Sequence, residues 1–258
     1  MREEFERTGA VLVGDVFGDE RSAIVHAVVE ACRAAPGPYY GVLSAPGRPL
    51  VDSDLFRWSD VPALRDALFD GPLPRLAADL LGTTKVVFVE DQWFASAPGA
   101  VTPSPRHQDG PYYNIDGDFV TLWVALDDAP AAAGLRVVPG SHRWGRTFAP
   151  VEFGDTAIAV GRTGGLEAVP PAAVLDRQSL GWDVRRGDVV ALHPSMLHSA
   201  GAQPIIGRWF RRLSTRWAAP DARCIDRGEQ AAAFWKIVDH GLRTGDPLSC
   251  PAFPLLVP

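Results

Sequence analysis

The chain has 258 residues, 47% of them hydrophobic, and its 25 Lys and Arg against 31 Asp and Glu give a formal net charge of -6. This length is enough for a full hydrophobic core and favours one domain over two. The acidic balance, without a long basic run, argues against nucleic acid and against an anionic membrane surface as partners.

Cysteine usage and hydropathy indicate the compartment. Cys32, Cys224 and Cys250 are odd in number and lack metal-type spacing, which is typical of a reduced protein rather than a disulfide scaffold. No apolar stretch reaches the roughly 18 residues of a membrane span, and the first residues lack the apolar core of a signal peptide. We therefore expect a cytoplasmic protein.

Residues 1 to about 83 are predicted to form a mainly helical lead-in. Ile24, Val28 and Ala31 recur at the spacing of one helical face, and the same pattern returns twice further along the chain. The predicted elements of this part are a strand at residues 10–13, helices at residues 19–33, 61–68 and 74–81, and a Pro- and Gly-rich loop at residues 37–50.

From about residue 84 the hydrophobic period changes to that of strands. The predicted strands are residues 85–90, 91–96, 119–126, 135–138, 188–193 and 212–217. Many short strands after a helical lead-in predict a mainly β fold with flanking α-helices, a two-sheet jelly roll of the cupin-like double-stranded β-helix type. Its core is expected over residues 84–220, with a C-terminal extension over residues 221–258.

One long insertion interrupts this core. Residues 148–183 are rich in Gly and Pro and carry few strand signals. Because irregular segments of this length in compact domains tend to be binding loops or lids, we expect this insertion to cover the active site.

His107 and Asp109 are the strongest functional signal in the chain. Side chains at i and i+2 of an extended segment point the same way, so the pair can grip one ion. His198, at the end of an apolar strand-like run, is the expected third ligand. Two His and one carboxylate on one face of a metal, with the opposite positions open, is the arrangement of non-heme Fe(II) oxygenases.

The residues around these ligands resemble the phytanoyl-CoA dioxygenase family of Fe(II)/2-oxoglutarate oxygenases. The similar blocks are residues 89–94, 106–114, 120–128 and 137–145, followed by Gly187, Asp188 and His198. The most specific block is Val-Pro-Gly-Ser-His-Arg at residues 138–143, and the resemblance covers about residues 85–220. It implies a single oxygenase domain over residues 1–258 that uses Fe(II), 2-oxoglutarate and O2.

The resemblance also implies the reaction. Decarboxylation of 2-oxoglutarate gives succinate and CO2 and drives oxidation of a small-molecule substrate, most simply its hydroxylation. Relatives that halogenate carry a small residue in place of the carboxylate, whereas this chain keeps Asp109. His142 and His193 are rival ligands. The family places its ligand before small residues and a turn, which matches His198.

The arginine that should bind 2-oxoglutarate departs from the family pattern. The family usually has it about eleven residues beyond the second His, where this chain has Trp209. Strand alternation places Arg208 and Arg212 inward and Arg211 outward. Arg212 is favoured because, with Ser214, it resembles the Arg-x-Ser pair by which other 2-oxoglutarate oxygenases hold this carboxylate.

Other positions are candidates for cosubstrate or substrate contacts. Trp123 resembles a strand Trp that lines the family's cosubstrate pocket, and Gln92 could offer its amide there; a core Trp and a paired core amide are the alternatives. Gln108, Tyr112 and Tyr113 lie beside the ligands and are expected to meet substrate.

Two other functional classes remain open at this stage. A cupin-like binding protein or isomerase would share the fold and metal site without 2-oxoglutarate chemistry, and the displaced arginine favours it. A metal-free relative would be expected to have lost the ligands, but all three are present. For an oxygenase, a largely apolar biosynthetic intermediate is the expected substrate, since no basic cluster suited to a CoA phosphate stands out.

Overall fold

The computed structural model describes residues 1–258 except 103, 152–164, 229–230, 232–234 and 236–237. Its helices are α1 (Arg2–Thr8), α2 (Gly18–Ala34), α3 (Pro62–Phe69), α4 (Leu73–Leu81) and α5 (Ala172–Leu175), with short 3-10 turns between them. Its strands are β1 (Ala10–Val13), β2 (Gly41–Val42), β3 (Val51–Leu55), β4 (Val86–Ser96), β5 (Ile115–Asp116), β6 (Phe119–Ala125), β7 (Leu135–Val137), β8 (Val189–Leu192), β9 (His198–Ala200), β10 (Phe210–Ala218), β11 (Arg223–Cys224) and β12 (Leu255–Leu256).

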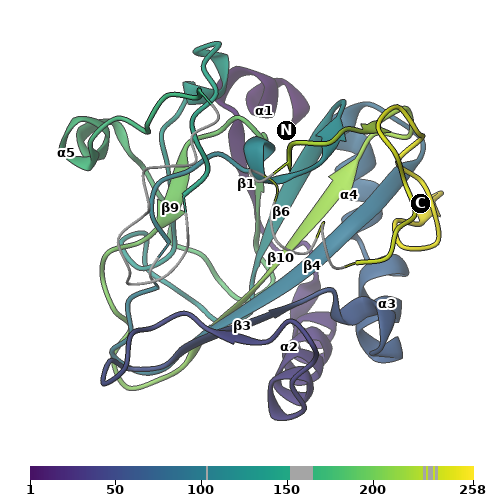
Figure 1. The fold of residues 1–258 in the computed structure, drawn as a ribbon. Helices are drawn as coiled ribbons and strands as arrows, with labels where there is room; N and C mark the ends of the chain where they lie inside the picture. Colours follow the sequence, from purple (N-terminus) through teal and green to yellow (C-terminus); the bar gives the residue numbers. More distant parts are fainter. Residues whose placement is uncertain (103, 152–164, 229–230, 232–234, 236–237) are drawn as a thin grey trace.

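An eight-stranded sheet forms the centre of the molecule. Its strands follow the order β1-β8-β6-β10-β4-β3-β2, with β12 paired to β4, and these strands pair with one another antiparallel. Two short ribbons, β7–β9 and β11–β5, complete the described β structure. In Figure 1, α2 and α3 lie on one side of the main sheet and β9 and α5 on the other. The predicted class, mainly β with flanking helices, is confirmed.

The two faces of the main sheet have different neighbours because its side chains alternate. Trp93, Leu122 and Leu213 are almost fully buried and belong to the cluster that also contains the buried residues of α2, α3 and α4. Residues one position away, such as Trp123 and Arg212, line a cavity on the opposite face. The helices thus seal one face of the sheet and leave the other for a site.

Helix α2 buries the stripe next to the one formed by Ile24, Val28 and Ala31. Val25, Val29 and Cys32 are buried, whereas Ile24 is 51% exposed. Both sets obey helical spacing, since the helix carries two neighbouring apolar stripes. The helix predicted over residues 19–33 is therefore confirmed, although its buried stripe lies beside the residues whose spacing predicted it.

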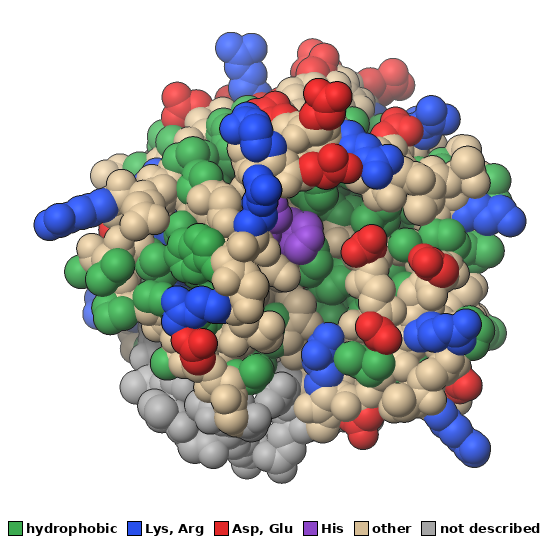
Figure 2. Space-filling view, turned by 90° about the horizontal axis from the view of Figure 1, so that it is seen from above, with side chains coloured by type: hydrophobic (Ala, Val, Ile, Leu, Met, Phe, Trp, Pro, Cys, Tyr) green, Lys and Arg blue, Asp and Glu red, His purple; other side chains and the backbone are tan. Residues whose placement is uncertain are grey.

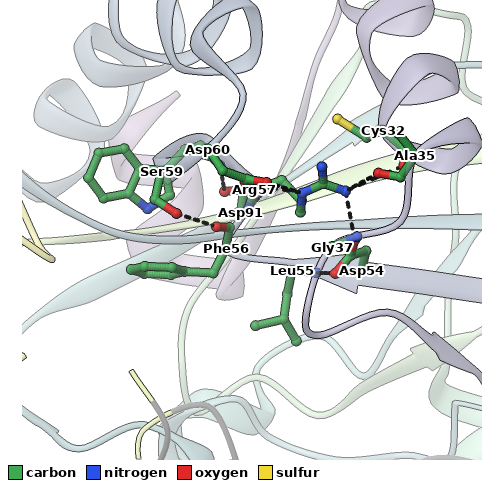
Figure 3. A network of polar contacts seen from close by, with 11 residues as sticks. Cys32, Ala35, Gly37, Asp54, Leu55, Phe56, Arg57, Ser59, Asp60 and Asp91 are labelled. Atoms are coloured by element: carbon green, nitrogen blue, oxygen red, sulfur yellow. Dashed lines mark hydrogen bonds and ion pairs between the residues drawn. The ribbon is translucent and has the colours of Figure 1, made fainter. Parts of the chain in front are cut away.

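A closed network of charges joins the helical lead-in to the sheet (Figure 3). The guanidinium of Arg57 pairs with Asp54 at 2.9 Å and donates to the Ala35 carbonyl at 3.0 Å. The carboxylate of Asp91 accepts the backbone N–H groups of Arg57 and Trp58 at 3.2 and 3.0 Å. Burial raises the pKa of Asp91 to about 6 even with these donors in place. Strand β3, which carries Asp54, lies just beyond the segment predicted as loop, and β2 lies within that segment.

Backbone pairing holds the insertion at residues 148–183 on both sides of its undescribed part. Phe148 and Glu167 form a parallel bridge, and Leu180 exchanges two backbone hydrogen bonds with Val137 at 2.9 and 3.0 Å. The remaining part of the predicted lid, residues 152–164, lies outside the described residues.

The distribution of charged side chains on the surface agrees with the absence of a long basic run in the sequence. On the face shown in Figure 2, basic and acidic side chains are interspersed with apolar ones rather than gathered into one basic area. Among the described residues, no helix combines the length and apolar character needed to cross a membrane.

Candidate active site

His107, Asp109 and His198 meet at one point although ninety residues of chain separate the first from the last. His107 and His198 form an antiparallel bridge in which each backbone N–H donates to the other's carbonyl at 2.9 Å. One oxygen of Asp109, Oδ1, lies 3.5 Å from Nε2 of each imidazole. The ligand atoms of the three buried side chains all lie within 4.8 Å of one another, which is compact enough for one ion.

The imidazoles are oriented through their other nitrogens. Nδ1 of His107 lies 2.8 Å from the Pro105 carbonyl oxygen, and Nδ1 of His198 lies 3.0 Å from that of Met196. A carbonyl oxygen only accepts, so Nδ1 carries the proton in both rings and Nε2 carries the lone pair. This is the tautomer that a metal-binding histidine needs.

Electrostatics favours the metal-binding protonation states. Burial lowers the pKa of His198 to about 4, so its imidazole is neutral at neutral pH. Burial by itself would raise the pKa of Asp109, but the Arg216 guanidinium and the two imidazoles outweigh it and hold that pKa well below its usual range. His198 and Asp109 therefore offer a neutral nitrogen and an anionic oxygen, the forms in which these side chains bind a cation.

The rival histidines lie elsewhere. Nε2 of His142 lies 3.1 Å from the Glu6 carbonyl oxygen, and Nδ1 of His193 accepts the backbone N–H of Ser195 at 3.0 Å. The two rings lie 5.1 Å apart, centroid to centroid, and neither belongs to the three-residue cluster. The preference for His198 as third ligand agrees with this geometry.

The cluster opens into a cavity of about 160 Å³ between the main sheet and the β7–β9 ribbon. His107 and His198 line one part of it, and side chains of β4, β6 and β10 line another. Strand register explains the arrangement, since Ser214 pairs with Gln92 on one side and with Trp123 on the other. The predicted cavity positions of Gln92 and Trp123 agree with this.

Arg212 is the unusual charge in this cavity. It is only 4% exposed, yet the described partners of its guanidinium are uncharged: the hydroxyls of Ser96 and Thr102, at 2.8 and 2.6 Å, and the Phe210 carbonyl at 3.2 Å. Among the residues that the structure describes, no carboxylate forms an ion pair with it. Burial lowers the pKa of Arg212 to about 9, so the group is still a cation at neutral pH.

Comparisons with known proteins agree with this site. A family model described as phytanoyl-CoA dioxygenase (PhyH) matches residues 5–203. The chain belongs to this family. Among curated proteins, 1-deoxypentalenic acid 11-beta-hydroxylase of Streptomyces arenae is 31% identical over 114 residues, which are 42% of this chain and 39% of that protein. The match thus spans well under half of that relative's length.

Solved structures share the whole fold. The alpha-ketoglutarate-dependent carbocyclase SnoK from nogalamycin biosynthesis matches with a TM-score of 0.76 and 21% identity over 99% of this chain and 94% of that one. The epimerase SnoN, in complex with Fe3+, alpha ketoglutarate and nogalamycin RO, matches with a TM-score of 0.74 and 22% identity over 98% and 96%. EctD from S. alaskensis matches with a TM-score of 0.70 and 17% identity over 97% and 85%. These neighbours confirm the predicted jelly roll.

The other two arginines lie outside the cavity. Arg208 is exposed and donates to the Asp128 carbonyl at 2.7 Å, so the prediction that it points inward is wrong. Strand β10 begins only at Phe210, and the alternation that placed Arg208 inward does not extend back to it. Arg211 faces away from the cavity, as predicted, and pairs with Glu30 at 2.5 Å.

The three residues predicted to meet substrate are engaged within the protein instead. The amide of Gln108 donates to two backbone carbonyls and accepts the Phe148 N–H at 2.9 Å. The hydroxyl of Tyr112 donates to the Val151 carbonyl at 2.6 Å, and that of Tyr113 to Glu90 at 2.8 Å. None of the three is among the described residues that line the cavity. Their hydrogen bonds instead hold the segment that carries His107 and Asp109, called the metal loop below, against the rest of the protein.

Two residues next to the cluster were missed by the sequence analysis. The hydroxyl of Thr121 donates to Oδ2 of Asp109 at 2.6 Å, and a terminal nitrogen of Arg216 lies 3.7 Å from the same oxygen. A signal for both was available, because Thr121 shares its strand face with Trp123 and Arg216 shares its face with Arg212.

Proposed function

We propose that this chain is an Fe(II)- and 2-oxoglutarate-dependent dioxygenase that hydroxylates a small-molecule biosynthetic intermediate. The observation that carries the proposal is the pairing of two features in one cavity. A buried arginine without a carboxylate partner among the described residues lies in the cavity that the two histidines of the ligand cluster also line. Each feature is incomplete alone, and a metal-chelating dicarboxylic acid completes both.

The ligand cluster fits Fe(II). His107, Asp109 and His198 supply the two imidazoles and one carboxylate of the facial arrangement that leaves positions for cosubstrate and O2. When bound, the iron supplies the redox chemistry that activates O2, while the protein supplies position and exclusion of water. In balance, 2-oxoglutarate, O2 and a C–H bond give succinate, CO2 and a C–OH bond.

The far end of the cavity fits the distal carboxylate of 2-oxoglutarate. The planar guanidinium of Arg212 matches a carboxylate in bidentate fashion, and Ser214 lies two residues on, on the same strand face. Gln92, which donates to Ser53 at 3.2 Å, and Trp123 flank Ser214 across the sheet and border the same space. We assign Arg212 as the main contact and these neighbours as the walls.

The remaining lining favours a largely apolar substrate. Apart from Arg212, Arg216 and the ligand histidines, the described side chains that line the cavity are uncharged, and they include Leu43, Phe94 and Leu135. Phe94 lines the cavity, whereas Trp93, the residue before it on β4, is buried in the core on the helix side of the sheet. The structural neighbours include an epimerase and a carbocyclase, and the curated relative is a hydroxylase. Hydroxylation is the outcome that we propose here, because it requires only transfer of one oxygen atom to the substrate.

A direct test uses the protein with Fe(II) under nitrogen. Addition of 2-oxoglutarate should give the weak visible charge-transfer band of a chelated cosubstrate, and O2 should then yield succinate. Arg212→Gln should weaken the band, whereas Arg208→Ala, outside the cavity, should not. Binding of metal without any band in the wild-type protein would favour the cupin-like alternative.

A further inference from the structure

We propose that Thr121 and Arg216 are positioning residues that hold Asp109 as a one-oxygen ligand, with Oδ1 toward the metal and Oδ2 turned away from it. This inference rests on the proposed function and concerns how many coordination positions the carboxylate takes. Neither residue belongs to the ligand cluster.

The two oxygens of Asp109 have different neighbours. Oδ1 lies 3.5 Å from Nε2 of His107 and 3.5 Å from Nε2 of His198. Oδ2 accepts the Thr121 hydroxyl at 2.6 Å and lies 3.7 Å from a terminal nitrogen of Arg216. A short hydrogen bond to a carboxylate is among the stronger ones in proteins, so rotation that brought Oδ2 to the metal would break it.

The sheet builds this support from one row of residues. Arg216 of β10 pairs in register with Thr121 of β6 on one side and with Glu90 of β4 on the other. Glu90 accepts from Arg216 at 3.0 Å and from the Tyr113 hydroxyl at 2.8 Å. Thr121, Glu90 and Arg216 are 1%, 2% and 7% exposed, so neighbouring atoms fix their rotamers. The row is therefore a rigid backing for Asp109.

The arrangement has a consequence for the coordination count. A facial set of three protein ligands leaves three positions, of which a chelating 2-oxoglutarate takes two and O2 takes the third. A carboxylate that bound through both oxygens would occupy one of these three. By retaining Oδ2, the row of Thr121 and Arg216 keeps that position open.

The test compares three substitutions in the Co(II)-loaded protein without cosubstrate. Thr121→Val removes the hydroxyl at nearly constant volume, Thr121→Ser keeps it, and Thr215→Val removes another buried hydroxyl, on the helix-facing side of the same sheet. Co(II) absorption in the visible region reports coordination number and ligand geometry, and titration gives metal affinity. We expect Thr121→Val to change the spectrum and to weaken Co(II) binding about 10- to 100-fold. Thr121→Ser and Thr215→Val should resemble the wild type.

Several results would overturn the inference. An unchanged spectrum in Thr121→Val would do so, even with weaker binding, because Thr121 would then stabilise the ligand without setting its mode. A spectrum changed equally in Thr215→Val would point to a general loosening of the sheet. If Thr121→Val does not fold, a crystal structure of the Co(II)-loaded wild type decides the point, since one short Asp109 contact supports the inference and two reject it.

The same experiments separate this inference from the proposed function. A wild-type protein that binds Co(II) through one Asp109 oxygen but does not bind 2-oxoglutarate would retain the positioning role and reject the oxygenase. If the protein binds 2-oxoglutarate while both oxygens of Asp109 bind the metal, the proposed function is retained and the positioning role of Thr121 and Arg216 is rejected.

Discussion

Two buried charged clusters lie on the same main sheet, and they differ in one respect. Around Arg57, the buried charges have partners within the protein. The guanidinium forms ion pairs with Asp54 and Asp60, and the Asp91 carboxylate accepts two backbone N–H groups. Around Arg212, the partners are two hydroxyls and one carbonyl. A buried cation that no described carboxylate pairs with is costly, so we infer that a ligand supplies the missing charge.

This difference separates structural from functional charge. The Arg57 cluster is complete in the folded chain and should act on stability alone. The Arg212 cavity and the ligand cluster are incomplete and should act on binding, with little effect on the fold. Substitutions in the two regions should therefore give opposite patterns.

The largest effect is expected at the ligands. His107→Ala, Asp109→Ala and His198→Ala should each abolish Fe(II) binding and turnover but leave a folded protein, because the strands build the core without the metal. Calorimetric titration of the metal and far-UV circular dichroism measure the two properties. His193→Ala, which alters the neighbouring non-ligand histidine, should retain the metal; if it were lost there and kept in His198→Ala, the third ligand would be His193.

The next effect concerns the closed cluster. Arg57→Ala leaves the buried Asp54 carboxylate without its cation, which should lower the free energy of unfolding by about 3–5 kcal/mol. Urea unfolding measures this change. Arg65→Ala removes a surface pair with Asp66 and should change stability by less than about 0.5 kcal/mol. Equal effects of the two substitutions would contradict the structural role of the Arg57 cluster.

Substitution in the Arg212 cavity should affect ligand binding rather than the free energy of unfolding. Arg212→Gln should weaken 2-oxoglutarate binding by about 2–5 kcal/mol, which is roughly 30-fold or more. Its free energy of unfolding without ligand should not fall, because the wild type buries there a cation that no described carboxylate neutralises. Titration of the Fe(II) protein with 2-oxoglutarate under nitrogen and urea unfolding without ligand test the two halves. Arg211→Ala, at the adjacent position outside the cavity, should leave 2-oxoglutarate binding unchanged.

Much of this architecture could be predicted from local pattern. Strands β6, β7, β8 and β10 were predicted within a few residues because their β-branched and aromatic runs end at Gly, Pro and Asp. The two strands predicted at residues 85–96 form the single strand β4, and β9, which carries His198, was not predicted. Strand alternation also identified Arg212, since that residue lies well inside β10. The same rule failed at Arg208, two residues before the strand begins.

The remainder depends on long-range pairing that the sequence does not display. Strand β3 was not predicted because Asp52 and Asp54 interrupt its hydrophobic pattern, and they are buried only because Arg33 and Arg57 approach from other elements. Tyr113 is near a ligand along the chain, but its hydroxyl bonds to Glu90 of another strand. Proximity in sequence thus located the metal loop without showing which of its side chains face the cavity.

The smallest predicted effect separates the half-buried His193 from the buried His198. Burial lowers the pKa of His193 to about 4, and burial likewise lowers that of His198 to about 4. Between about pH 6.5 and pH 4 the unfolded chain binds these protons and the folded chain does not. Stability therefore falls as the pH is lowered through this window. His193→Gln should remove on the order of 1 kcal/mol of that dependence, after allowance for the partial exposure of the ring.

Bound metal should distinguish the contributions of His193 and His198 to this pH dependence because, of the two, only His198 is an assigned ligand. Saturating Co(II) should steepen the loss of stability below pH 6.5, since protons then compete with the metal at the ligand cluster. The share due to His193 should be the same with and without Co(II). Urea unfolding of wild type and His193→Gln at several pH values, each with Co(II) or with chelator, measures both shares. If the two proteins gave parallel pH profiles, burial of His193 would not couple its protonation to folding, and the assignment of the pair to separate roles would lose its support.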